Sequence, residues 1–160
     1  MQAFDIGTYL AALPRRDIGL LPLGTDAPKP RANGSLQNYN GFSGKERLRT
    51  FELAKWLHRS GAMPHTGECS ICGSPADQQH AEDYFDLTTW MDICRGCHVS
   101  LHGRFATPDA WRRRVQQFHL PSSHWACALP SEEPDIAAFH RLRGRGEPTA
   151  SDFIMSASDG

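Results

Sequence analysis

Four cysteines in two closely spaced pairs carry the clearest chemistry in the sequence. Cys69 and Cys72 form one CxxC pair, and Cys94 and Cys97 form a second pair 22 residues later. Two intervening residues let both thiolates of a pair reach one metal, and four thiolates complete a tetrahedral zinc site. The pattern therefore predicts a closed, structural zinc, with two disulfides as the less favoured alternative. Cys127 has no partner at this spacing, and we expect it to be buried.

Histidines and acidic residues lie between and after the two pairs. His98 and His102 are four residues apart, so on a helix that begins at the second pair both imidazoles face the same side and can share a metal. His80 comes from the other side of the predicted hairpin and can meet them, and Glu82 and Asp83 follow it. We expect a second, open metal site there that holds Mg²⁺, Mn²⁺, Zn²⁺ or Ni²⁺.

A longer pattern joins these residues: a CxxC, then HAEDY at 80–84, then CxxCH and LH at 94–102, ending at Arg104. It resembles the zinc-knuckle type of HNH (ββα-metal, or His-Me finger) nucleases, and short bacterial and phage proteins with an H-x-E-D-Y motif before CxxCH-x2-LH-x-R. In such nucleases a metal holds the scissile phosphate, and a strand histidine takes a proton from the attacking water. The resemblance implies an endonuclease that hydrolyses nucleic-acid phosphodiester bonds, with DNA as its expected partner.

The resemblance also implies roles for the three histidines. His98 corresponds to the metal ligand at the start of the helix, and His102 to a second ligand present in some members. His80 matches the strand histidine, either as base or as ligand. No asparagine follows Asn40, so the family's middle Asn has no counterpart, and three residues are candidates to replace its loop-fixing hydrogen bond: Thr88, Thr89 or Asp92.

The two alignments of His80 leave different gaps. If His80 is the base, Gln79 stands where the ligand belongs, and an amide is a poor ligand. If His80 is the ligand, Ala81 stands where the base belongs, and Glu82 or Asp83 would serve as ligand or base. A non-catalytic zinc module that binds nucleic acid or a protein partner is therefore the alternative function.

Helices must position these residues. Helical periodicity runs from Lys45 to Ser60 behind a capping Ser43, and a second helix begins at Thr107-Pro108-Asp109 and ends near His119. Shorter elements are expected at 3–13 and 134–143.

These elements predict an α+β fold. A small ββα-metal core with a four-Cys structural zinc is flanked by helices and an irregular N-terminal arm. Residues 1–44 form the arm, 45–128 the HNH-like zinc domain with its flanking helices, and 129–160 a C-terminal extension whose end, 144–160, is frayed.

Charge neither supports nor excludes a nucleic-acid partner, because the net charge of -1 hides local basic groups. Arg112, Arg113 and Arg114 on the second predicted helix are candidate phosphate contacts, with a solvated helix face as the alternative. Arg104, beside the predicted site, is a candidate phosphate clamp. The arm offers a surface for a protein partner. Without a long apolar run or a basic leader, we expect a cytoplasmic protein with no membrane partner.

Overall fold

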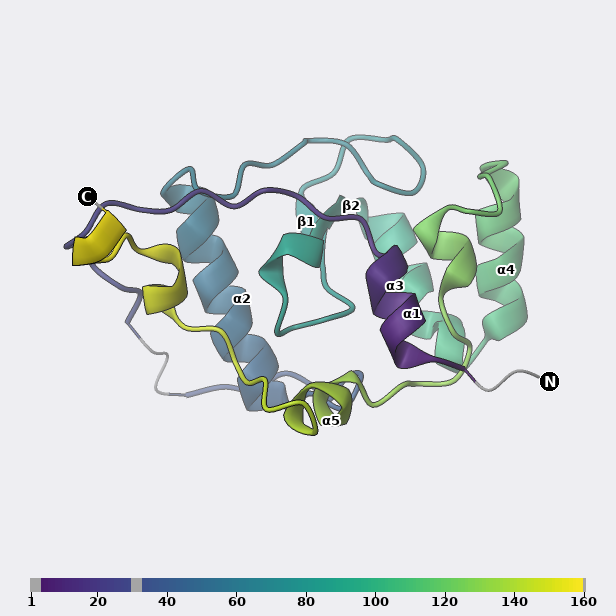
Figure 1. The fold of residues 1–160 in the computed structure, drawn as a ribbon. Helices are drawn as coiled ribbons and strands as arrows, with labels where there is room; N and C mark the ends of the chain where they lie inside the picture. The colour runs from purple at the N-terminus through teal and green to yellow at the C-terminus, as the bar shows by residue number, and fades with distance from the viewer. Residues whose placement is uncertain (1–3, 30–32, 160) are drawn as a thin grey trace. The chain divides into compact units, whose positions relative to one another are not determined.

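The structure is a computed structural model that describes residues 4–29 and 33–159. It divides into two compact units, each built from stretches that are separate in the sequence (Figure 1). Unit 1 comprises Met1–Arg15, Thr66–Glu82 and Thr89–Pro134, and the other segments form unit 2: Arg16–His65, Asp83–Thr88 and Asp135–Gly160. The units alternate along the chain, whereas the three ranges predicted from sequence are consecutive. Helices and one small sheet make a mixed α+β fold, as predicted.

The sheet of unit 1 consists of two antiparallel strands, β1 (Gln78–His80) and β2 (Met91–Ile93). His80, the last residue of β1, lies opposite Met91 in the register. Helix α3 (Arg95–His102) begins two residues after β2 ends. Two strands of three residues are too short to be stable on their own, so the sheet depends on the groups packed around it.

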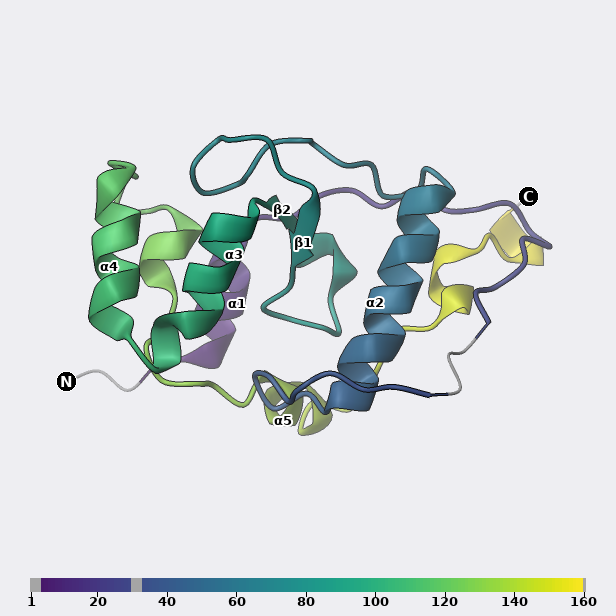
Figure 2. The same cartoon turned by 180° about the vertical axis from the view of Figure 1, so that it is seen from behind.

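Helix α4 (Pro108–Gln117) lies beside α3 in both views of unit 1 (Figures 1 and 2). It confirms the second predicted helix, but Thr107 makes no capping hydrogen bond, because its hydroxyl donates to Gly103 O instead. The apolar core of this unit includes Ile71, Ile93, Leu101, Trp111, Val115 and Trp125. The remaining short elements of unit 1 are α1 (Ile6–Ala12), η2 (Gly103–Phe105) and η3 (Trp125–Ala128).

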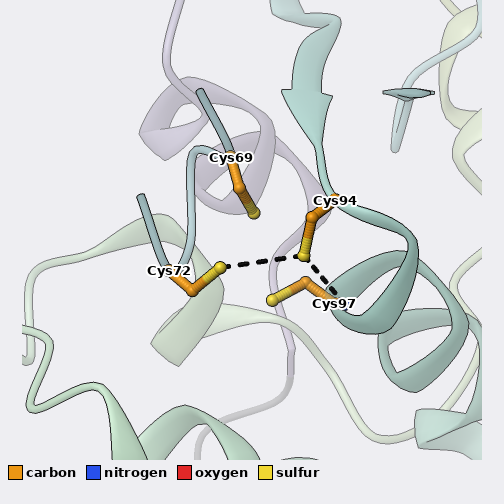
Figure 3. A group of neighbouring side chains, drawn as sticks. All are labelled: Cys69, Cys72, Cys94 and Cys97. Carbon is orange, nitrogen blue, oxygen red and sulfur yellow. Dashed lines mark hydrogen bonds between the residues drawn. The ribbon is translucent and has the colours of Figure 1, made fainter. Parts of the chain in front are cut away.

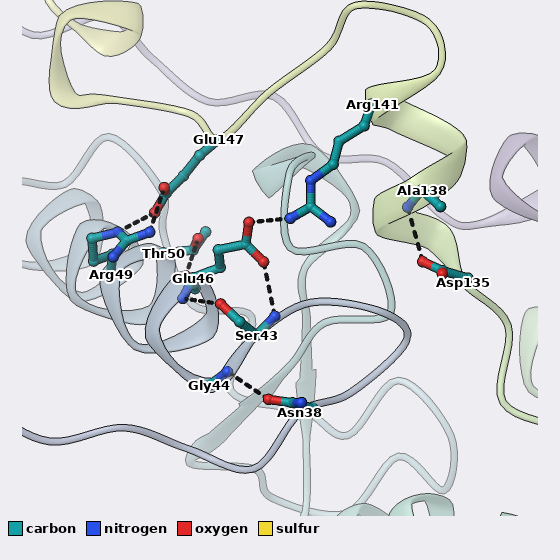
Figure 4. A network of polar contacts seen from close by, with 10 residues as sticks. All are labelled: Asn38, Ser43, Gly44, Glu46, Arg49, Thr50, Asp135, Ala138, Arg141 and Glu147. Carbon is teal, nitrogen blue, oxygen red and sulfur yellow. Dashed lines mark hydrogen bonds and ion pairs between the residues drawn. The ribbon is translucent and has the colours of Figure 1, made fainter.

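Unit 2 is built on α2 (Gly44–Arg59), the first helix predicted from sequence. Ser43 caps it as expected: the Ser43 side chain accepts from the Glu46 amide, and the Glu46 carboxylate accepts from the Ser43 amide (Figure 4). Helix α5 (Ile136–Arg141) lies within the short element predicted at 134–143. Its last residue, Arg141, pairs with Glu46.

The C-terminal tail is not frayed over its described residues. Leu21 of the arm forms a parallel bridge with Ile154, and Glu147 pairs with Arg49 over 2.7 Å. Short 3-10 helices, η4 (Ala150–Phe153) and η5 (Ala157–Asp159), occupy this segment, and η1 (Leu87–Thr89) precedes β2 in the sequence. The tail is ordered by contacts with the arm, which is distant in sequence. Sequence periodicity does not predict such contacts.

The predicted arm, residues 1–44, contains α1 and the first residue of α2, and it is irregular between these helices: its described residues there form isolated bridges but no helix and no strand of several residues. Residues 30–32 lie outside the described residues. The arm is nevertheless packed, because Tyr39, Asn40 and Phe42 are buried. In the part of the chain that the structure describes, no helix is long and apolar enough to cross a membrane.

The capping box of α2 makes a test of local stability. Burial by itself raises the pKa of Glu46, but hydrogen bonds from Ser43 and the Arg141 guanidinium outweigh it and lower that pKa below its usual value. The ionised carboxylate therefore stabilises the fold above the unfolded-state pKa, and this contribution is lost as pH falls through the lower folded pKa. We expect Glu46→Gln to cost roughly 0.5 kcal/mol at pH 7, because its partner Arg141 is exposed and solvent screens the pair.

Urea unfolding of wild type and Glu46→Gln between pH 7 and pH 3 measures this difference, with the exposed Glu132→Gln as control. The gap between wild type and Glu46→Gln should close as the solution becomes acidic. A gap that widens on acidification would contradict the assignment.

Candidate metal centres

Four cysteine side chains of unit 1 converge on one point (Figure 3). Cys69 and Cys72 lie in the turn before β1, and Cys94 and Cys97 lie at the start of α3; their sulfur atoms are all within 4.8 Å of one another. The Sγ atoms of Cys72 and Cys94 are 3.7 Å apart. Sulfurs bound to one tetrahedral zinc at about 2.3 Å are about 3.8 Å apart, whereas those of a disulfide are about 2.05 Å apart. The cluster could hold one structural metal ion, and all four cysteines are free.

Two different turns present the thiols. The Gly73 amide donates to Cys69 O at 2.9 Å, and Gly73 has φ +77, a left-handed conformation that favours glycine. Cys94 instead caps α3, because its sulfur accepts from the Cys97 amide. Gly96 lies inside that helix without a positive φ, so it does not supply backbone freedom as Gly73 does.

Buried Asp92 holds the turn that leads to the first pair. Its carboxylate accepts from the Thr66 hydroxyl at 2.8 Å and from the Gly67 amide at 3.2 Å. Asp92 is one of the three candidates to replace the loop-fixing hydrogen bond of the family's middle Asn. The loop that its carboxylate holds here is the one that precedes Cys69. The carboxylate thus links β2 to the cysteine turn.

Arg114 of α4 contacts the cysteine cluster directly. Its Nη2 donates to Cys97 Sγ at 3.6 Å, and a Cβ added at Gly96 would lie 2.7 Å from the same Nη2. The absence of a side chain at Gly96 therefore gives the guanidinium its place beside the sulfur. A cation there offsets the negative charge of a four-thiolate metal site. Arg114, predicted to contact nucleic acid, is used instead by the cysteine cluster.

The pKa values of two of the thiols are shifted in opposite directions. Burial raises the pKa of Cys97 above its usual range, and the hydrogen bond from Arg114 opposes that rise. For Cys72, burial also raises the pKa, but hydrogen bonds from Ser74, Cys94 and Cys69 outweigh it and lower the pKa to about 6. Cys72 is therefore ready to ionise near neutral pH, as metal binding requires.

The three histidines of the motif also come together. His80 ends β1, and His98 and His102 lie one turn apart on α3; one ligand atom from each lies within 4.8 Å of the others. The Nε2 atoms of His98 and His102 are 3.1 Å apart. Two nitrogens bound to one tetrahedral zinc at about 2.0–2.1 Å would be about 3.3 Å apart. The spacing fits a hydrogen bond between the two rings and is also close to that of two ligands of one ion.

Each of two imidazoles is oriented by an outer partner. His98 Nδ1 lies 2.8 Å from Gln78 Oε1, and an amide oxygen only accepts, so Nδ1 carries the proton and Nε2 keeps its lone pair. His80 Nε2 lies 2.6 Å from Glu82 Oε2, which leaves Nδ1 as its ligand atom. Metal-binding histidines are commonly fixed by such carboxylate or carbonyl partners.

Glu82 is the centre of a buried polar network rather than a solvated charge. Its side chain is fully buried and accepts from the Tyr9 hydroxyl of α1, from Arg104 Nη2 at 2.8 Å and from His80. Three partners satisfy a carboxylate that would otherwise be costly to bury. Glu82 therefore orients His80 and is not itself directed at a metal by any described contact.

The sequence-based role of Arg104 as a phosphate clamp is wrong for this structure. Its side chain is fully buried, because the guanidinium pairs with Glu82 and also donates to Pro130 O at 2.9 Å and Leu101 O at 3.2 Å. A guanidinium committed to these acceptors has no edge to offer a phosphate.

Asp83, next to Glu82 in sequence, serves unit 2. Its Oδ2 lies 2.7 Å from His140 Nε2, and its Oδ1 accepts from the Phe85 amide at 3.0 Å. Both partners of the Asp83–His140 pair are buried. The pairing of Asp83 with His140 could not be predicted from residue spacing. Asp83 is not part of the cluster formed by His80, His98 and His102.

The other two arginines of α4 differ from each other. Arg112 pairs with Asp109 one turn earlier, while Arg113 is exposed and forms no ion pair within the described residues. Of the four arginines predicted to contact nucleic acid, only Arg113 has no ion-pair or hydrogen-bond partner among the described residues.

The cysteine cluster predicts a metal requirement for folding. We expect Cys94→Ser to lose one bound metal and the fold of unit 1, because binding at such sites contributes about 10–16 kcal/mol. Elemental analysis and near-UV circular dichroism measure both effects. Cys127→Ser is the matched control, since Cys127 proves exposed rather than buried and lies outside the cluster. Equal metal content in the two variants would refute the assignment.

The Arg114 contact predicts faster metal loss when it is removed. We expect Arg114→Gln to release metal to a chelator about tenfold faster than wild type, the lower end of the effect of outer partners. Gly96→Ala should act in the same direction by displacing the guanidinium. Arg113→Gln, one residue away and exposed, should release metal at the wild-type rate. Equal rates for all four proteins would show that Arg114 does not stabilise the centre.

Comparison of the chain with protein-family models, curated proteins and solved structures finds no match. The likeness to HNH nucleases consequently rests on the motif between Cys69 and Arg104 alone.

Proposed function

We propose that the chain is a metal-dependent, HNH-like endonuclease that hydrolyses phosphodiester bonds of nucleic acid, with DNA as the first substrate to test. The observation that carries the proposal is the convergence of His80, His98 and His102 on a β1–β2–α3 segment. This order of elements corresponds to the ββα-metal core of that family, and the cysteine cluster starts the same helix.

The two clusters suit different tasks. Four thiolates complete the coordination of zinc, so the cysteine cluster takes the structural role. Three neutral imidazoles leave coordination positions open, and this arrangement is typical of catalytic metal sites. A divalent metal there, Zn²⁺, Mn²⁺, Mg²⁺ or Ni²⁺, would lower the pKa of a bound water and offset charge on the phosphate.

The geometry favours His80 as a ligand rather than as a base. Its Nε2 is held by Glu82, so Nδ1 is the nitrogen that would be available to share a metal with His98 and His102. A side chain that is fully buried is poorly placed to take a proton from a water that attacks a bulky polymer. Under this assignment, Glu82 positions His80, and activation of water depends on the metal.

A specific observation supports the alternative function, a non-catalytic zinc module that binds nucleic acid or protein. Ala81 occupies the position of the strand base and is buried, with an exposed fraction of 2 %. A methyl group can neither accept nor donate a proton. Retained metal without any cleavage would therefore favour this module.

A plasmid-nicking assay with Mg²⁺, Mn²⁺ or Ni²⁺ tests the proposal. We expect His98→Ala and His80→Ala each to lower cleavage about 100-fold or more, because each removes a ligand of the metal that activates water. The same variants should bind one fewer equivalent of Mn²⁺ or Co²⁺ while keeping the cysteine-bound metal.

His119→Asn is the matched control for loss of a histidine. His119 is exposed and has φ +49, a conformation that Asn tolerates better than Ala. Cleavage that survives loss of both His80 and His98 would place the activity elsewhere. No cleavage of DNA or RNA by folded wild-type protein with both metals bound would exclude the nuclease.

A further inference from the structure

Exposed arginines of unit 2 differ in whether they have an acidic partner among the described residues. Arg49 and Arg141 each pair with a glutamate (Figure 4). Arg143 and Arg145 are also exposed, but neither forms an ion pair among the residues that the structure describes. No acidic side chain among the described residues neutralises their charges.

The turn after α5 brings these two arginines to one place. The amides of Arg143 and Arg145 both donate to His140 O, at 2.9 and 3.0 Å. Gly144 between them has φ +69, and its amide donates to Arg141 O at 3.0 Å. A left-handed glycine after a helix reverses the chain, so both side chains return to the end of α5.

Phe139 is the surface on which both guanidinium groups rest. The Arg143 Cζ lies 3.5 Å from the centre of the Phe139 ring, and its Nη1 donates to Phe139 O at 2.9 Å. The Arg145 Cζ lies 5.6 Å from the same ring. Cation–π contacts of this kind limit the freedom of long side chains and leave their outer N–H groups for a ligand.

We propose that Arg143, Arg145 and Phe139 form a binding surface for the phosphate backbone of a nucleic acid. The inference rests on the proposed function, since it names a surface that would hold the substrate. A guanidinium presents paired N–H donors that match phosphate oxygens, and two of them side by side fit adjacent phosphates or one phosphate held from two sides.

Nucleic acid fits this surface better than an acidic protein segment. A guanidinium over an aromatic ring can also stack with an unpaired base. Leu142, between the two arginines in sequence, is 85 % exposed and offers apolar contact to a base or sugar. An acidic peptide would use the charge but neither of these features.

Binding of a labelled oligonucleotide, followed by fluorescence anisotropy at several salt concentrations without added divalent metal, tests the surface. For Arg143→Gln/Arg145→Gln we expect affinity to fall about tenfold at low salt, and the slope of log K against log salt to fall by about two. Arg145→Gln alone should give about half of the change in log K and half of the change in slope. This substitution removes no side-chain hydrogen bond within the described residues.

Two further variants separate this surface from a simple dependence on total charge. Phe139→Leu keeps both arginines but removes the ring, so we expect about threefold weaker binding with an unchanged salt slope. Arg59→Gln removes one exposed arginine from the end of α2, which forms no ion pair among the described residues, and it should change affinity less than twofold. Circular dichroism confirms that each variant is folded.

The outcomes distinguish this surface from the nuclease. If binding responds as expected but wild type does not cleave, the nuclease proposal is rejected and the proposed binding surface is supported. Cleavage by the double variant with unchanged KM and unchanged salt dependence would remove the surface and keep the nuclease. Binding of a poly-glutamate peptide that equals that of the oligonucleotide, and is lost in the same variants, would overturn the choice of nucleic acid.

Discussion

The requirement that four thiols meet at one point is the constraint on which unit 1 depends. β1 and β2 have three residues each, and such a pair contributes little stability by itself. The cysteine pairs lie before β1 and after β2, so one metal ion between them would hold the hairpin and the start of α3 together. Because the energy of metal binding is then folding energy, the position of His98, the residue after Cys97, follows from the same event.

A second constraint is the buried charge of Glu82. Its three partners come from α1, β1 and the segment after α3, and loss of any one would leave a desolvated charge poorly compensated. This explains why Arg104 is a structural residue although it lies close to the histidines in sequence. It also explains how His80 keeps one orientation. The neighbouring carboxylate, Asp83, meets the equivalent need of unit 2 through His140.

The spacing of residues in the sequence predicted much of this arrangement, because metal ligands and helix caps recur at fixed separations of a few residues. The four cysteines, the convergence of the three histidines and the Ser43 cap all lie within such rules. The partners of Glu82 do not, since Tyr9 is 73 residues away and nothing in its surroundings marks it. The same holds for the contact of Arg114 with Cys97 and for the tail against Leu21, which depend on how distant segments pack.

The charges of the two centres would differ in sign although Cys97 and His98 are adjacent. A divalent ion with four thiolates carries a net charge of about -2, whereas the same ion with three neutral imidazoles keeps about +2. The first repels a phosphate and is closed, and the second attracts one and is open. Arg114 moderates the negative centre from α4. Under the proposed function, the adjacent sites would separate the structural task from the chemical one by ligand type alone, and a polyanionic substrate would be drawn to the histidines rather than to the cysteines.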